Sequence, residues 1–301
     1  MKSIITGFFE EPSLDKLESK LALMVKHGID HLAIRAYDHR PLVELSDGEI
    51  KKLLLDTKGM RVKFSILDAG ILPYDPYNAR KHQDAIDTFK YMLKIADRLK
   101  ITYILLNLPE INDIIQEYST YEKIIGDYLD QAMRQGKKIV INPQKGYKSN
   151  TYVYLLKKMK SKHLTIAFDP VLIMQNNEST TTAYRILKPY ISVVYAHDAN
   201  QKHEPELIGF GKADTAKILK KLARDRFDGF VIVDHHFHKN LFDESTIKLG
   251  FFKKIFSNEK KVREKRISEL SKRIFPDEET KNVTADDILE NQIKVIEKIM
   301  G

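Results

Sequence analysis

Residues 163–169 read HLTIAFD and residues 191–197 read ISVVYAH. Each stretch is a short run of apolar and β-branched residues that ends in a polar side chain, which is typical of a strand buried on both faces of a parallel sheet. Six further stretches share this pattern: Ser3–Phe9, Asp30–Ala36, Met60–Ile66, Thr102–Asn107, Lys137–Asn142 and Gly229–His235. The sequence therefore predicts eight strands.

The segments between these strands carry apolar residues at helical spacing. Strands that alternate with helices pair in parallel through right-handed crossovers, and eight such units close most economically into a (β/α)8 TIM barrel. An open doubly wound sheet is the alternative, but the stretch FFEEP at residues 8–12 lacks the glycines of a phosphate-binding turn after the first strand. We therefore predict an α/β fold with the barrel over residues 1–240.

Residues 241–301 are highly charged and predict a helical C-terminal extension. Its last helix, expected over residues 286–300, carries an apolar stripe that needs a partner surface. Packing on the barrel and a contact in a homodimer both satisfy that need, and the pattern does not choose between them. Helix starts with capping-box spacing are expected at Ser46, Ser119 and Thr284.

The composition excludes several classes of protein. The chain has no cysteine, so disulfides, thiolate zinc sites and a cysteine nucleophile are absent, and a reducing cytoplasm is the expected location. No apolar run approaches the ~20 residues of a membrane-spanning helix, and the apolar start of the chain lacks a signal-peptide cleavage site. The net charge is +8, and residues 253–273 hold nine Lys or Arg against three Glu. Such interspersed charges favour a solvated helix face over a nucleic-acid patch.

Polar side chains stand at the C-terminal ends of the predicted strands. The active site of a (β/α)8 barrel lies at this end of its strands. Any one of them has an ordinary explanation, such as capping the next helix, but their convergence on one face predicts a pocket. They are Arg35, Asp68, Asn107, Asn142, Asp169, Tyr195, His197, Asp198, Asp234, His235 and His236.

Four segments, together with their order and spacing, resemble the xylose isomerase-like superfamily, within it the sugar phosphate isomerase/epimerase family. Residues 164–170 (LTIAFDP) are similar to its sixth strand and residues 191–199 (ISVVYAHDA) to its seventh. Residues 209–214 (GFGKAD) are similar to its G-x-G loop, and residues 227–236 (FDGFVIVDHH) to its eighth strand.

The resemblance implies a divalent metal, Mn²⁺, Mg²⁺ or Co²⁺, held by a Glu, an Asp, a His and a Glu from strands five to eight. The two glutamates of that family act as acid and base through a cis-enediolate. This chain has Asn142, Tyr195 and Asp234 where the family has Glu, His and Glu, and it keeps Asp169. The metal site is therefore expected to be degenerate, and the metal can be absent.

The residues that the resemblance assigns fall into three roles. The candidate metal ligands are Asp169, Asp234 and Asn142, and the candidate catalytic residues are Asp234, Asn142 and His197. The candidate substrate-binding residues are Arg35, Asn107, Lys145, Tyr195, Asp198 and His236.

Three functions remain open. The first is a sugar or sugar-phosphate isomerase or epimerase that acts by proton transfer. The second is a non-catalytic sugar-binding barrel that has lost the metal-dependent chemistry. The third is an abasic-site endonuclease-like enzyme, supported only by the basic residues 253–273. The expected partner is a small sugar or sugar phosphate, without membrane contact and without nucleic acid.

Overall fold

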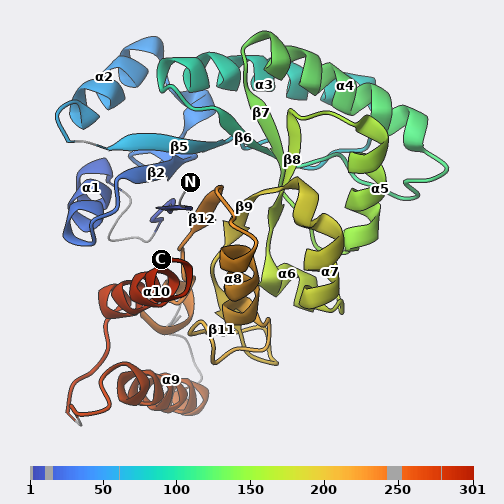
Figure 1. Cartoon of the computed structure of the whole chain (residues 1–301). Coiled ribbons are helices and arrows are strands. Elements are labelled where there is room, and N and C mark those ends of the chain that lie inside the picture. The colour runs from blue at the N-terminus through green and yellow to red at the C-terminus, as the bar shows by residue number, and fades with distance from the viewer. Residues whose placement is uncertain (1–2, 11–15, 61, 243–252, 279) are drawn as a thin grey trace.

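The computed structural model of the protein describes residues 3–10, 16–60, 62–242, 253–278 and 280–301 (Figure 1). Eight parallel strands form one sheet in the order β1-β12-β9-β8-β7-β6-β5-β2. They are β1 (Ile4–Thr6), β2 (His31–Ile34), β5 (Lys63–Asp68), β6 (Tyr103–Leu106), β7 (Lys138–Ile141), β8 (Leu164–Phe168), β9 (Ile191–Tyr195) and β12 (Phe230–Ile232). The amide of Ala33 donates to the carbonyl of Gly7 at 3.0 Å, so the two outer strands meet and the sheet nearly closes. The predicted (β/α)8 barrel is confirmed.

All eight predicted strands are present, and each is shorter than its apolar stretch. The third is also displaced, since it was predicted over residues 60–66 and runs over Lys63–Asp68. The amide of Met60 donates to the carbonyl of Thr57 at 3.2 Å, so Met60 belongs to the turn that ends the preceding helix. Arg61 lies outside the described residues.

The interior of the barrel is a packed apolar core, as in other barrels of this kind. Its buried side chains are Phe8, Ala33, Ile66, Leu105, Val140, Ala167, Val193 and Ile232. Seven of these side chains come from within a strand, and the eighth, Phe8, lies two residues after β1. At one end of this core the rings of Tyr103 and Phe230 meet edge to face, with centroids 5.2 Å apart.

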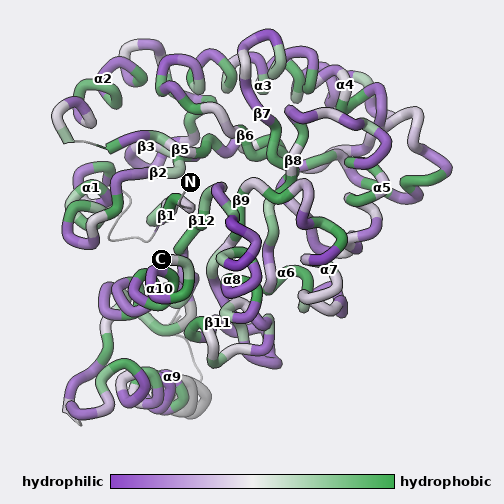
Figure 2. The backbone as a smooth tube through the Cα atoms, in the orientation of Figure 1, coloured by the Kyte–Doolittle hydropathy of each residue, from purple (hydrophilic) through white to green (hydrophobic). Residues whose placement is uncertain are grey.

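Helices cover the outside of the sheet. They are α1 (Leu17–Lys26), α2 (Asp47–Thr57), α3 (Ala79–Arg98), α4 (Tyr118–Arg134), α5 (Ser149–Met159), α6 (Pro170–Gln175), α7 (Thr180–Leu187), α8 (Thr215–Arg224) and α10 (Ala285–Met300). Another helix, α9 (Lys253–Ile274), packs against α10 and residues 238–242 and lies away from the sheet (Figure 1). Short elements in the loops are β3 (Ala36–Tyr37), β4 (Arg40–Pro41), η2 (Leu42–Glu44), η3 (Lys188–Tyr190), β10 (Asp198–Ala199), β11 (Pro205–Glu206) and η4 (His238–Phe242). Hydrophobic residues run along the central strands, and hydrophilic residues mark the outer helix faces (Figure 2). No helix in the described ranges combines the length and apolar character needed to cross a bilayer.

Two of the three predicted helix starts are correct. Ser46 and Thr284 form capping boxes at the starts of α2 and α10. Ser119 does not cap a helix, because α4 begins at Tyr118. The carboxylate of Asp113 accepts the amides of Ile115 and Gln116 at 2.9 and 3.1 Å, so the chain starts to coil before the predicted cap.

The apolar stripe of α10 lies against the barrel. Leu289, Ile293 and Ile296 are buried in the core between strands and helices. The helix packs against α8, and Nε2 of His27 at the end of α1 lies 2.8 Å from Oδ1 of Asp286. In the described structure α10 thus occupies the place of an eighth barrel helix. A division at residue 240 and a homodimer stay predictions.

One buried carboxylate binds two arginines of α9. Glu206 in β11 is 5% exposed and accepts Arg266 at 2.6 Å and Arg273 at 2.8 Å. Burial alone raises the pKa of Glu206, but the bond from Arg266 and the charges of both arginines lower it overall. Two of the basic residues in the segment 253–273 therefore serve an intramolecular contact. The side chains of residues 253–259 lie outside the described part.

We expect Glu206→Gln to lower the free energy of unfolding by about 2 kcal/mol at neutral pH, because two half-buried guanidinium groups lose their counter-charge. The folded-state pKa of Glu206 lies below its ordinary value of 4.5, so this stabilisation is complete above that pH and lost as the pH falls through the folded-state pKa. Urea unfolding followed by circular dichroism should show that the difference in free energy of unfolding between Glu206→Gln and wild type becomes smaller in acid. Glu264→Gln is the control, since Glu264 lies on α9 with Arg266 and Arg273 but is 63% exposed. An equal loss in both variants would contradict the argument.

Candidate functional site

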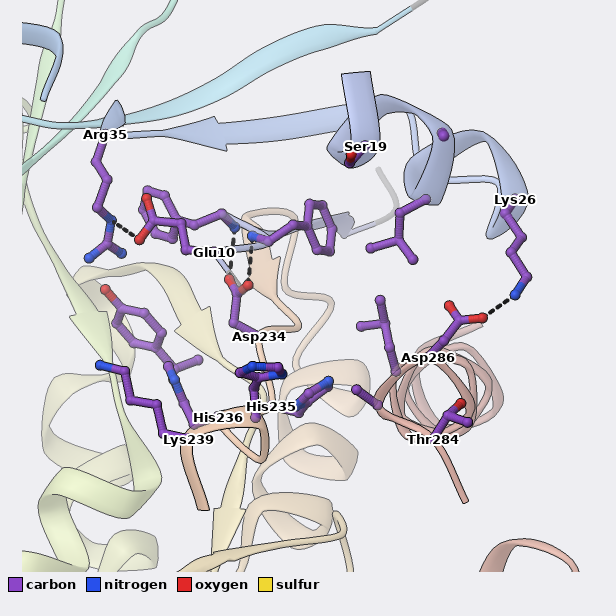
Figure 3. A pocket seen from close by; sticks show the side chains of 18 residues that line it. Glu10, Ser19, Lys26, Arg35, Asp234, His235, His236, Lys239, Thr284 and Asp286 are labelled. Carbon is purple, nitrogen blue, oxygen red and sulfur yellow. Dashed lines mark hydrogen bonds and ion pairs between the residues drawn. The ribbon is translucent and has the colours of Figure 1, made fainter. Parts of the chain in front are cut away.

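A cavity of about 680 Å³ opens at the C-terminal end of the barrel. Its walls come from the residues after β1 and β12 and from α1 and α10 (Figure 3). Four of the predicted site residues line it: Arg35, Tyr195, Asp234 and His236. The cavity therefore joins the barrel mouth to a space between two helices that the strand pattern does not reveal.

Asp234 follows β12 and ties the last strand to the first. Its two carboxylate oxygens accept the amides of Phe8 and Phe9, each at 2.8 Å (Figure 3). Phe9 has a φ of 51°, a left-handed conformation that an apolar residue rarely adopts. The carboxylate thus supports a strained turn, and its predicted catalytic role stays a prediction.

The guanidinium group of Arg35 lies beside this turn, between two carboxylates. Nε of Arg35 is 3.4 Å from Glu10, its Nη1 is 3.7 Å from Asp68, and its guanidinium carbon lies 3.9 Å from the centroid of the Phe8 ring. Burial raises the pKa of Glu10, with Arg35 opposing that rise. Glu10 is a site residue that was not predicted, although it directly follows the first predicted strand and so carries the same signal as Arg35.

A chain of neutral hydrogen bonds crosses the mouth. Tyr195 donates to Oδ1 of Asn142 at 3.1 Å, and Nδ2 of Asn142 donates to Oδ1 of Asn107 at 3.0 Å. Asn107 in turn donates to the carbonyl of Ile71 at 2.9 Å. Burial raises the pKa of Tyr195 well above its ordinary range, so it remains a protonated donor. The predicted positions on β6, β7 and β9 are therefore brought together, and they are bonded to one another.

Asp169 and His197 form an ion pair at the ends of β8 and β9. Oδ1 of Asp169 lies 2.8 Å from Nε2 of His197 and also accepts the amide of Leu172 at 3.0 Å, which caps α6. Burial opposes charge on both groups, yet their mutual attraction lowers the pKa of Asp169 and raises that of His197. The side chains are 18% and 14% exposed, and His236 separates the pair from the cavity that it lines.

Two further histidines follow β12 in different environments. The ring of His236 is exposed on the cavity wall, with its centroid 5.0 Å from that of His197. Desolvation at that wall, and then the charge of His197, lower the pKa of His236. His235 is buried, and burial lowers its pKa to about 4, so its Nδ1 accepts the amide of Phe237 at 3.1 Å. The positive charge of His197 thus favours the neutral form of His236.

Asp198 and Lys145, like Asn107, are predicted substrate-binding residues that do not line the cavity. Asp198 is buried, and burial raises its pKa against the opposing amide bonds from Ala213, Ala199 and Gly209. Lys145 is exposed in the loop after β7. For both residues contact with a substrate stays a prediction.

The positions that the resemblance implies for a metal do not fit one. Asn142 is bonded on both sides of its amide, Asp234 uses both oxygens on backbone amides, and Asp169 is paired with His197. Within the described ranges no three His, Asp or Glu side chains are grouped to hold an ion. A four-ligand site would need these bonds to break, so we derive no step through a metal.

Solved structures with the same architecture include sugar epimerases. A D-psicose 3-epimerase solved with D-fructose has a TM-score of 0.66 and 15% identity, covering all of both chains. A D-tagatose 3-epimerase-like protein has a TM-score of 0.63 and 19% identity over 89% of this chain and 100% of its own. An IOLI protein that binds zinc has a TM-score of 0.63 and 18% identity over 91% of this chain and 99% of its own. No curated protein matches by sequence.

A family model supplies the decisive comparison. The model described as "Xylose isomerase-like TIM barrel" matches residues 21–255, which is most of the chain and spans strands β2 to β12. The segments that carry the resemblance in the sequence, the confirmed strand order and the polar mouth all fall inside or beside this match. The protein therefore belongs to the xylose isomerase-like TIM barrel family.

Proposed function

We propose that this protein is a sugar isomerase or epimerase-like enzyme that moves a proton next to a carbonyl group with His197 and His236 as its acid and base. The observation that carries the proposal is the row Asp169–His197–His236, with a 2.8 Å ion pair at one end and a cavity-lining imidazole at the other. Pairs of groups whose environments push their pKa values apart are typical acid and base partners.

The chemistry follows from the two charge states. Neutral His236 takes the proton from the carbon beside the carbonyl, the C–H electron pair forms the enediol double bond, and the carbonyl electrons move to oxygen. Protonated His197 donates to that oxygen, and its Nδ1 has no hydrogen-bond partner among the described residues. Protonated His236 then returns its proton to the former carbonyl carbon, the second hydroxyl of the enediol gives its proton to His197 as it becomes the new carbonyl, and both histidines regain their starting charge states. Because a single base acts on one face, isomerisation is favoured over epimerisation.

A neutral sugar fits the mouth better than a sugar phosphate. The charge of Arg35 is already shared between Glu10 and Asp68. Tyr195 and the amides of Asn142 and Asn107 offer polar groups suited to hydroxyls. The epimerases that share the fold act on sugars according to their names, which supports the same class of ligand here.

The test is exchange of sugar C–H protons with D₂O, followed by NMR across a panel of aldoses and ketoses, with EDTA and with added Mn²⁺ or Co²⁺. We expect exchange in at least one sugar that is as fast with EDTA as with metal. Exchange that requires a metal would reject the His197–His236 mechanism in favour of metal-dependent chemistry.

A sugar-binding barrel without catalysis is the second candidate. Its support is the direct bond between Tyr195 and Asn142, because these positions carry a metal-binding His and a Glu in the family that the sequence resembles. A sugar that raises the melting temperature without any C–H exchange would favour this candidate. The endonuclease-like alternative is not proposed, since Arg266 and Arg273 are bound to Glu206.

A further inference from the structure

The cavity continues beyond the polar barrel mouth into an arm between α1 and α10. Ala22 and Leu23 of α1 form one wall of this arm, and Leu289 of α10 forms another. Ala22 is exposed and Leu23 is half-buried, so both present carbon to the open space. Arg35 lies at one end of the cavity and Lys26 at the other (Figure 3).

Two ion pairs mark the ends of the cavity, and its other charged side chains, Asp234 and Lys239, follow β12 at the barrel mouth (Figure 3). At the mouth, Arg35 and Glu10 pair with each other, and at the far end Lys26 pairs with Asp286. Between the groups that follow β12 and the Lys26–Asp286 pair, the two helices contribute mainly the carbon of Ala22, Leu23 and Leu289. A ligand that fills the cavity therefore meets hydroxyl-binding groups at one end and an apolar surface along the arm.

The volume also exceeds the needs of a simple sugar. At about 680 Å³ the cavity is within the range of ~300–1,000 Å³ that encloses ligands of drug size. A free monosaccharide bound beside His236 and Tyr195 would leave the arm to water against carbon, which is unfavourable.

We propose that the ligand of this site is a sugar carrying a short apolar substituent, with the sugar at the barrel mouth and the substituent between α1 and α10. This inference rests on the proposed function for the identity of the polar end alone. The Lys26–Asp286 pair bounds the arm, so a ring or short chain fits it better than a long acyl chain.

Calorimetric titration of the full chain tests this with D-fructose and D-glucose, their 6-O-benzyl ethers, and benzyl alcohol. Burying one phenyl ring is worth about a tenfold gain in affinity or more, so the better ether should bind at least that much more tightly than its parent sugar. Benzyl alcohol alone should bind far more weakly than the ether, because it leaves the polar mouth unused.

Ala22→Phe should fill the arm and remove the tenfold gain while leaving the affinity for the parent sugar unchanged. Val25→Phe is the matched control, since Val25 is 65% exposed on the same helix and does not line the cavity. If Ala22→Phe does not fold, Ser19→Phe, which also lines the arm, replaces it.

Equal affinity for ether and parent, failure of every ether to bind, retention of the gain in Ala22→Phe, or tight binding of benzyl alcohol alone would each overturn the inference. The proposed function is judged separately by C–H exchange. Tight ether binding without exchange would support the inference and reject the enzyme. C–H exchange in a parent sugar, with no higher affinity for its ether, would support the enzyme and reject the inference.

Discussion

Replacing Asp169 with asparagine should lower the rate of sugar C–H exchange at least about a hundredfold, the usual contribution of a positioned proton donor. Without the carboxylate charge, burial lowers the pKa of His197, so the imidazole loses the proton that it donates to the sugar oxygen. His236 then loses the neighbouring positive charge that lowers its own pKa. Rates measured by NMR in D₂O would show the loss.

The pH profile separates this role from a merely structural one. In the wild type the charge of Asp169 raises the pKa of His197 above its ordinary value, so exchange should fall as the pH rises through that raised pKa. In Asp169→Asn the same fall should occur at lower pH. The stability that the pair adds follows the same sign for His197, being present below its unfolded-state pKa and lost above its folded-state pKa.

The matched control is a second Asp–His pair outside the site. Asp127 on α4 lies 2.9 Å from His82 on α3, and neither residue lines the cavity. Asp127→Asn should leave the exchange rate and its pH profile unchanged. Equal rates for Asp169→Asn and wild type would show that the ion pair does not take part in proton transfer.

The fold could be predicted because its signals are local. Apolar runs such as residues 163–169 mark strands that are buried on both faces, and helical spacing marks the segments between them. The strand ends then locate the polar mouth, and Arg35, Tyr195 and His236 do lie there. The boundaries were less well predicted, as Met60 shows, because a helix-ending turn leaves no apolar signature.

The partners of each polar group could not be predicted in the same way. Asp234 accepts amides from Phe8 and Phe9, more than two hundred residues earlier in the chain. Any carboxylate at a strand end could have bound a ligand instead, and only the tertiary arrangement decides which neighbour lies within 3 Å. The arm of the cavity could not be predicted for the same reason, since the apolar stripe of the last helix does not reveal which surface it faces.

Asp198 illustrates how a residue can match a family motif for a structural reason. Its Oδ1 accepts the amide of Ala213 at 3.0 Å, and Gly211 lies directly against the same carboxylate. A Cβ at position 211 would stand 2.0 Å from that oxygen and 2.8 Å from the carbonyl of Ala199. The glycine of the G-x-G loop is therefore required by close packing on a buried acid.

Gly211→Ala should consequently lower the free energy of unfolding by at least about 2 kcal/mol, because the loop must move off Asp198 and leave buried amides without their acceptor. Gly126→Ala in α4 is the opposite case. It has no heavy atom within 4 Å of the new Cβ, so alanine should stabilise the helix by about 0.5–1 kcal/mol. Urea unfolding of both variants by circular dichroism compares the same chemical change with opposite expected signs. If Gly211→Ala is as stable as wild type, the Asp198 loop yields freely, and the close approach at Gly211 does not shape this side of the barrel mouth.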